Sequence, residues 1–302
     1  MRNSAALCLF IVSLYACTGI EKTVTTDQSD YTRFVDPFIG TAQHGHVFLG
    51  ANVPFGAVQL GPVNITHGWD WCSGYNYADS TIYGFAHTHL SGTGIGDLGD
   101  IVIMPVTGEV TLKKGIAGDQ ESGYYSLFSH DEEIARPGYY SVYLKRYGVK
   151  AELTTTERVG FHQYQFPAGE VAKTIIDLEY GIGWDAPVET MLQQVNDSTL
   201  AGYRYSKGWA VDQRIYFTAI FSKPVKHFAL YDSTSSINRN QAKGKRIKAV
   251  LTFGDIKDEV LKIKVGISPV STENAAGNIA AEVPGWDFDA VRQSAHEAWN
   301  NE

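Results

Sequence analysis

A run of histidines, glycines and aspartates at positions 84–100 is the first candidate for chemistry in this sequence. It reads GFAHTHLSGTGIGDLGD, with His87 and His89 separated by one residue and Asp97 and Asp100 farther along. Two histidines at alternate positions of a strand face the same side and could bind a metal, with either aspartate as a third ligand. The segment lacks the Lys-Ser/Thr pair of a phosphate-binding loop. A glycine turn capped by the aspartates would use the same residues without any chemistry.

An aromatic stretch at positions 67–77, HGWDWCSGYNY, has the composition of a sugar-binding loop. Trp69 and Trp71 flank Asp70, and Cys72 follows them. A flat aromatic ring covers the apolar C–H face of a pyranose, and neighbouring carboxylates and amides bind its hydroxyls. A core strand with two buried tryptophans is the alternative. The glycines on both sides favour a loop, and loops carry sites more often than strands do.

A third polar segment at positions 34–62 carries Asp36, His44, His46 and Asn52 among several glycines. These residues do not make a case for a nucleophilic Ser-His-Asp triad. No Gly-x-Ser-x-Gly motif occurs anywhere in the chain, so the serine nucleophile of the α/β-hydrolase type is missing as well.

The first seventeen residues, MRNSAALCLFIVSLYAC, predict a secretory signal. The apolar run at 5–16 follows one arginine and is too short to span a bilayer comfortably. A small residue precedes Cys17, as in the lipobox of bacterial lipoproteins, although Tyr15 is unusual there. We therefore expect export and lipidation of Cys17 at the outer membrane, facing the periplasm or the cell surface. An ordinary signal peptide is the alternative. Polar residues 18–30 would then form a flexible tether.

The composition is that of a folded, acidic protein. The chain has 302 residues, a formal net charge of −8, and 44% hydrophobic and 12% aromatic residues. An acidic chain with scattered lysines and arginines has little to neutralise a phosphate backbone, so we expect no nucleic-acid partner. Cys8 and Cys17 lie in the predicted signal, which leaves Cys72 without a partner for an intrachain disulfide.

Strand patterns dominate residues 31–285. VLKIKVGIS at 260–268 alternates apolar residues with Lys262 and Lys264, as a strand with one wet face requires. RIYFTAIF at 214–221 has apolar residues on both faces. Many strands with turn signals between them and no helical pattern predict an all-β fold, a large two-sheet antiparallel β-sandwich. Two small sandwiches are the alternative.

A short helix is predicted at the C-terminal end, within residues 286–302. Phe288, Val291, Ala295 and Trp299 share one helical face, and Asp287 precedes the helix as a candidate N-cap. A short helix with an apolar stripe needs a surface to pack on, either the flank of the sandwich or a further domain.

Four ordered motifs resemble the start of glycoside hydrolase family 92, the calcium-dependent exo-acting α-mannosidases of gut Bacteroidetes. They are VDPFIGT, GANVPFGAVQLGP, GWDWCSGYNY and GFAHTHLSGTGIGDLGD. The resemblance implies an N-terminal β-sandwich that packs on a C-terminal (α/α)6 barrel, with an inverting acid and base pair. It also implies that the catalytic carboxylates and the calcium ligands lie on the barrel. Residues 286–302 would then begin the linker towards a domain missing from this chain.

By the same resemblance, loops of the sandwich reach the mannoside cleft, whereas no residue of this chain is expected to be catalytic or to bind a metal. The residues expected to contact substrate are Trp69, Asp70, Trp71, Cys72, His87 and His89. Val47 and Leu49 depart from the usual His-Thr-x-Pro-Gly-Ala pattern, which leaves no family role for His46. The expected function is one wall of a mannoside cleft in N-glycan or mannan degradation, inactive alone. A surface glycan-binding lipoprotein or a non-functional fragment of a truncated enzyme are the alternatives.

Overall fold

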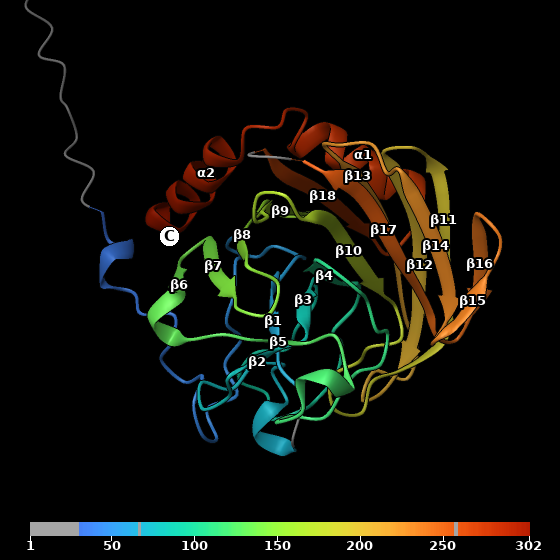
Figure 1. The fold of residues 1–302 in the computed structure, drawn as a ribbon. Helices are drawn as coiled ribbons and strands as arrows, with labels where there is room; N and C mark the ends of the chain where they lie inside the picture. The colour runs from blue at the N-terminus through green and yellow to red at the C-terminus, as the bar shows by residue number, and fades with distance from the viewer. Residues whose placement is uncertain (1–29, 66–67, 257–258) are drawn as a thin grey trace, which may run out of the picture. The chain divides into compact units, whose positions relative to one another are not determined.

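Two large antiparallel sheets face each other in the computed structural model, which describes residues 30–65, 68–256 and 259–302 (Figure 1). The predicted signal peptide, Cys17 and all but the last residue of the tether lie outside the described residues. The first sheet has seven strands in the described chain. In spatial order they are β1 (Gly61–Val63), β3 (Gly84–Ala86), β4 (Val102–Val106), β10 (Val171–Asp177), β17 (Ile247–Asp255), β14 (His227–Asp232) and β15 (Ser235–Ile237).

The second sheet has nine strands in the same described ranges. Their spatial order is β16 (Gln241–Gly244), β11 (Ala186–Asn196), β12 (Thr199–Lys207), β13 (Gln213–Phe221), β18 (Val260–Ser268), β9 (Val159–Gln165), β8 (Val149–Thr155), β7 (Tyr139–Leu144) and β6 (Glu133–Arg136). A short pair, β2 (Thr81–Ile82) and β5 (Ser126–Leu127), stands apart from both. Short 3-10 turns are η1 (Thr32–Phe34), η2 (Trp69–Trp71), η3 (Gln120–Ser122) and η4 (His130–Glu132).

The core lies between the sheets and follows the alternation of the strands. In β13, Ile215, Phe217, Ala219 and Phe221 are buried towards the other sheet. Burying such side chains is the main favourable term in folding, at about 25 cal/mol per Å² of apolar surface removed from water. The predicted two-sheet antiparallel sandwich is therefore confirmed.

The prediction of a wet face for β18 is wrong over the C-terminal half of that strand. Lys264 is buried, and its Nζ donates a hydrogen bond to the carbonyl oxygen of Val283 at 2.8 Å. The same ammonium lies 4.0 Å from the centre of the Trp286 ring, a favourable cation–π arrangement. Burial lowers the pKa of Lys264. The chain around Val283 returns across the outer face of the sheet, which a period-two pattern does not reveal.

Two helices pack on the sandwich, α1 (Thr272–Glu282) beside β18 and β13, and α2 (Phe288–Asn301) against β7 and β8 (Figure 1). Asp287 caps α2 as expected, because its side chain accepts a hydrogen bond from the Ala290 amide at 3.0 Å. Helix α1 was not predicted from the sequence, because Gly277 weakens its helical pattern. No helix among the described residues combines the length and apolar character needed to cross a membrane.

Gly266 sets how closely α1 packs on the sheet, which makes it a sensitive test of the fold. A Cβ at this position would lie 2.2 Å from the carbonyl oxygen of Ala275 in α1. Gly266→Ala should therefore lower the free energy of unfolding by about 1–3 kcal/mol, measured by urea denaturation. In the matched variant Gly277→Ala, the added Cβ meets no atom within 4 Å, and stability should rise by up to about 1 kcal/mol. Wild-type stability in Gly266→Ala would contradict the close packing.

Candidate functional site

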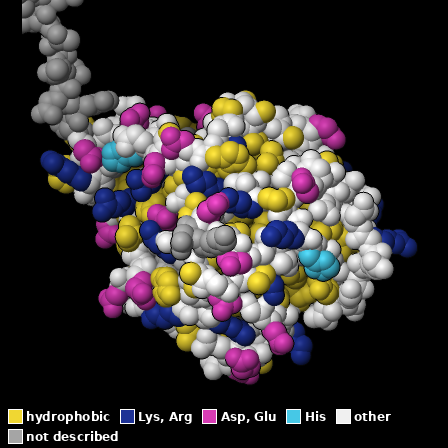
Figure 2. Space-filling model, turned by 45° about the horizontal axis from the view of Figure 1, so that its top comes forward, with side chains coloured by type: hydrophobic (Ala, Val, Ile, Leu, Met, Phe, Trp, Pro, Cys, Tyr) yellow, Lys and Arg dark blue, Asp and Glu magenta, His cyan; other side chains and the backbone are white. Residues whose placement is uncertain are grey.

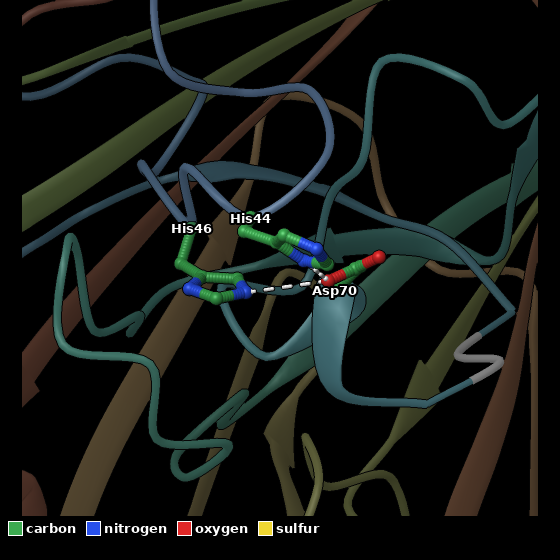
Figure 3. A group of neighbouring side chains, drawn as sticks. All are labelled: His44, His46 and Asp70. Carbon is green, nitrogen blue, oxygen red and sulfur yellow. Dashed lines mark hydrogen bonds and ion pairs between the residues drawn. The ribbon is translucent and has the colours of Figure 1, made fainter.

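The loop from Gly40 to Val47 folds tightly and holds two histidines side by side (Figure 3). Gly45 lies so close to Gly40 that a Cβ on it would be 2.1 Å from the Gly40 carbonyl oxygen. His46 has a left-handed backbone with φ of 56°. Such a conformation costs a residue with a side chain about 1 kcal/mol or more, and strained residues of this kind cluster at functional sites. The glycines thus let His44 and His46 face the same neighbour.

That neighbour is Asp70, which η2 presents to both rings (Figure 3). Nδ1 of His44 donates a hydrogen bond to Oδ1 of Asp70 at 2.6 Å, and Nε2 of His46 lies 3.6 Å from the same oxygen. The hydrogen bond from His44 lowers the pKa of Asp70, so its carboxylate is ionised at neutral pH. Because the Asp70 side chain is partly exposed, the carboxylate remains able to accept further hydrogen bonds.

Trp69 covers this group and is fixed in place while remaining 59% exposed. Its ring centre lies 4.2 Å from that of His46 and 5.3 Å from that of His44. Its Nε1 donates to the carbonyl oxygen of Gly94 at 2.7 Å, which joins the aromatic loop to the glycine-rich loop. An exposed aromatic ring beside an ionised carboxylate is the arrangement that binds a sugar face and its hydroxyls.

Trp71 and Cys72, also predicted to contact substrate, lie deeper in the protein. Nε1 of the half-buried Trp71 donates to Oδ2 of Asp79 at 2.8 Å. Cys72 is buried and not in a disulfide, and burial raises the pKa of its thiol. Within the predicted loop, Trp69 and Asp70 thus offer groups to solvent, while Trp71 and Cys72 help to hold the loop.

His87 lies inside the sandwich rather than at its surface. Its Nδ1 donates to the carbonyl oxygen of Ile101 at 2.7 Å, so its Nε2 accepts from Nε2 of His162 at 3.0 Å. Tyr164 completes the chain, because its hydroxyl donates to Nδ1 of His162 at 2.7 Å. Burial lowers the pKa of His87 to about 4 and that of His162 well below its usual value. Both rings are neutral at neutral pH and link the two sheets.

His89 is also buried, close to the loop that carries Phe48. Its Nδ1 donates to the carbonyl oxygen of Gln59 at 2.9 Å, and its ring centre is 4.8 Å from that of Phe48. Its Nε2 makes no hydrogen bond with any part of the chain that the structure describes. Burial lowers the pKa of His89 to about 4. Within this chain, the ring therefore supports neighbouring loops as a neutral group.

The aspartates of the glycine-rich segment connect it to other parts of the fold. Oδ2 of Asp97 accepts from the Ala210 amide at 2.8 Å. Oδ1 of the buried Asp100 accepts from Nη1 of Arg204 at 2.8 Å, and Arg204 also pairs with Asp185. Sequence reasoning did not select Arg204. Arg204 lies on the same face of β12 as the buried Leu200, four residues earlier, and this spacing could have predicted that Arg204 is buried.

His44, His46 and Asp70 form a candidate metal site, because their three ligand atoms lie within 4.8 Å of one another. Calcium prefers six to eight oxygen ligands, and two of these three donors are nitrogens, so the set does not fit the calcium that the sequence resemblance implies. The donor types would suit zinc. However, the 2.6 Å contact between His44 and Asp70 is a direct hydrogen bond with no room for an ion between its atoms. The group is therefore a polar cluster beside Trp69.

Comparison with known proteins identifies the family of this chain. Residues 34–268 match the family model named glycosyl hydrolase family 92 N-terminal domain. The structure resembles the family GH92 α-mannosidase BT3965 from Bacteroides thetaiotaomicron, with a TM-score of 0.86 and 38% identity, over 90% of this chain and 37% of that one. The inverting GH92 mannosidase BT2199 of the same species has a TM-score of 0.76 and 27% identity, over 89% of this chain and 36% of that one.

A curated relative, an uncharacterized secreted glycosidase of Arthroderma benhamiae, is 26% identical over 90% of this chain and 38% of its own length. The chain thus spans 36–38% of the length of each of these three relatives. Because the family model matches most of the chain, this protein belongs to glycosyl hydrolase family 92, and residues 34–268 are its N-terminal domain.

Proposed function

We propose that this chain forms one wall of a cleft that binds an α-mannoside during N-glycan or mannan degradation. The observation that carries the proposal is the Trp69–Asp70 pair, in which an exposed ring and an ionised carboxylate are held together by His44 and Gly94. The ring would cover the apolar face of the sugar, and the carboxylate would accept hydrogen bonds from its hydroxyls. The description of BT3965 as an α-mannosidase supports mannose as the sugar.

Hydrolysis itself is assigned to residues outside this chain. An inverting glycosidase uses two carboxyl groups about 6.5–9.5 Å apart, one of them protonated. Asp70 is kept ionised by its hydrogen bond from His44, which suits it for binding hydroxyls and not for protonating a leaving group. We expect the purified chain to release no mannose from α-mannobiose, and any measurable release would contradict this assignment.

The proposed partner that supplies those residues is a C-terminal (α/α)6 barrel, with calcium bound on the barrel. An apolar surface supports this proposal. Tyr31, Val35 and Ile39 are exposed and line a cavity of about 420 Å³ that Trp299 of α2 also borders. Exposed apolar patches of this kind mark interaction surfaces. Mixing the chain with the separately produced barrel of the same protein should then give calcium-dependent mannose release.

Nucleic acid is not among the partners that we propose. The face in Figure 2 shows lysine and arginine side chains interspersed with acidic ones, which supports the expectation of no nucleic-acid partner. Export is supported by the description of the Arthroderma relative as secreted. Lipidation of Cys17 would place the chain at the outer membrane, and mass spectrometry of the exported protein would detect the lipid.

Binding of α-mannobiose, followed by titration calorimetry and ligand-observed NMR, tests the proposed cleft. We expect millimolar affinity in the wild-type chain, because half a cleft leaves many sugar hydroxyls unsatisfied. Trp69→Ala should weaken binding about tenfold, and its melting temperature is measured as well because the variant also loses the hydrogen bond to Gly94. Phe55→Ala removes another exposed aromatic ring and is the matched control, expected to bind as wild type.

Two outcomes would change the proposed function. Unchanged binding in Trp69→Ala would contradict a cleft built on this ring. Micromolar affinity of the isolated chain would instead favour a complete binding site, as in a stand-alone glycan-binding module. The Asp70→Asn variant adds a second readout, because it keeps the shape of the side chain and removes the charge that His44 stabilises.

A further inference from the structure

Three exposed tryptophans stand on three separate loops. The exposed fractions of Trp69, Trp184 and Trp209 are 59%, 67% and 62%. A tryptophan carries a large apolar surface, and leaving one in water forgoes the free energy of burying it. The other three tryptophans, Trp71, Trp286 and Trp299, are half-buried, and Trp299 also donates a hydrogen bond to the Asn52 carbonyl oxygen. The three exposed rings are therefore candidates for ligand contacts.

One short segment holds all three loops. The Gly94 carbonyl oxygen accepts from Nε1 of Trp69 at 2.7 Å, and the Gly96 carbonyl oxygen accepts from the backbone amide of Trp184 at 2.9 Å. Asp97 accepts from the amide of Ala210, the residue after Trp209, at 2.8 Å. Consecutive Cα atoms are about 3.8 Å apart, so positions 94 and 97 are separated by at most about 11 Å. Three ring-bearing loops thus meet at one place.

The backbones of these loops are packed tightly enough to present their rings reproducibly. A Cβ on Gly96 would lie 2.7 Å from the Cα of Gly183, next to Trp184. A Cβ on Gly208, next to Trp209, would lie 2.2 Å from Oδ1 of Asp97 and 3.0 Å from the Cα of Asp185. Asp185 is in turn held by the buried Arg204. Rings on a fixed backbone lose little conformational entropy when a ligand stacks on them.

We propose that Trp184 and Trp209 extend the Trp69 surface into a binding site for an α-mannoside of several sugar units. This inference rests on the proposed function, in which Trp69 binds one sugar. The added rings would stack on the C–H faces of sugars farther along the same oligosaccharide. Charged Lys207 and Asp212 flank the loop of Trp209, and both are exposed. That setting differs from the core of a protein interface, where charged residues are depleted.

Binding of α-mannobiose and of a linear α-mannopentaose to the 302-residue chain tests the inference. The wild type should bind the longer glycan about tenfold or more tightly, because two further rings take part. Trp184→Ala and Trp209→Ala should each weaken pentasaccharide binding about fivefold and leave mannobiose binding unchanged. Trp184→Phe should keep part of the affinity, since a phenyl ring still stacks. Phe55→Ala is the control for loss of an exposed ring, and melting temperatures confirm folding.

The possible failures are distinguishable. If Trp69→Ala weakens mannobiose binding but affinity does not grow with glycan length, the proposed function stands and the extended site is wrong. If Trp69→Ala leaves mannobiose binding unchanged, the proposed function fails first. Protection of Trp184 and Trp209 from acrylamide quenching when the barrel is added, with no effect of pentasaccharide, would show that these rings contact protein. That result would also overturn the extended site.

Discussion

Arg204→Met should lower the free energy of unfolding by about 3–5 kcal/mol, because it removes the positive charge from a fully buried ion network. The guanidinium pairs with Asp100 at 2.8 Å and with Asp185. It also donates to the carbonyl oxygens of Leu178 at 3.1 Å and Tyr180 at 2.6 Å. Methionine has a similar length but no donor. The variant would therefore leave two buried carboxylates and two carbonyl groups without their partner.

The matched control is Arg214→Met on the neighbouring strand. Arg214 and Asp212 form an exposed pair, so the melting temperature should hardly change. Adding Asp100→Asn and Asp185→Asn to Arg204→Met should recover part of the lost stability, because no uncompensated charge is then buried. Urea denaturation of the wild type and the three variants measures these differences. If Arg204→Met and Arg214→Met are equally stable, the buried network does not stabilise the segments that carry Asp100 and Asp185.

The network of Arg204, Asp100 and Asp185 also restricts the movement of the loops that carry Trp184 and Trp209. Asp185 directly follows Trp184, and a Cβ on Gly208, the residue before Trp209, would lie 3.0 Å from the Cα of Asp185. Loss of Arg204 should therefore loosen the loops that present two of the rings, in addition to lowering stability. Glycan binding by the Arg204→Met variant should fall more for a pentasaccharide than for mannobiose.

The alternation of apolar and polar residues predicted the sandwich well, because successive side chains of a strand point to opposite faces of the sheet. RIYFTAIF has apolar residues on both faces, and the structure buries Ile215, Phe217, Ala219 and Phe221 in the core. Trp69 and Asp70 could be selected because aromatic and acidic residues in a glycine-flanked loop suit a sugar. The helix α1 was harder, since packing on β18 and β13 supports it more than its own propensity does.

Long-range contacts account for what the sequence did not predict. His87 was expected to contact substrate, but its ring bonds to His162, which lies 75 positions away on the opposite sheet. His44 and His46 join Asp70 only through the fold of a distant loop. A histidine on a strand can be a ligand or a satisfied core residue, and only the position of its partners separates the two.

Acidification from pH 7 to about pH 5 should lower the free energy of unfolding by about 2 kcal/mol for each of His87 and His89. Burial holds the pKa of both at about 4, whereas an unfolded histidine has a pKa near 6.5. Between these values the unfolded chain binds more protons than the folded one, so stability rises with pH. The stability is complete above about pH 6.5 and is lost as the pH falls towards about 4.

Three further buried groups, His162, Asp185 and Asp177, also affect how the free energy of unfolding depends on pH. The pKa of His162 is lowered by burial, so it contributes with the same sign. Burial raises the pKa of Asp185, which opposes the loss once this carboxyl begins to take up protons. Asp177 has a lowered pKa despite its burial, chiefly because Lys248 lies 3.0 Å away, and it adds a loss below about pH 4. The histidines therefore dominate between about pH 6.5 and 5.

His89→Asn isolates one of these histidines. An asparagine amide can keep the hydrogen bond that Nδ1 of His89 donates to the Gln59 carbonyl oxygen, and it does not titrate. Its free energy of unfolding, measured by urea denaturation at several pH values, should fall about 2 kcal/mol less than that of the wild type between pH 7 and 5. His227→Asn replaces an exposed histidine and should follow the wild-type curve. If His89→Asn keeps the full pH dependence, or the wild type shows none, these histidines are not buried and neutral in the folded protein.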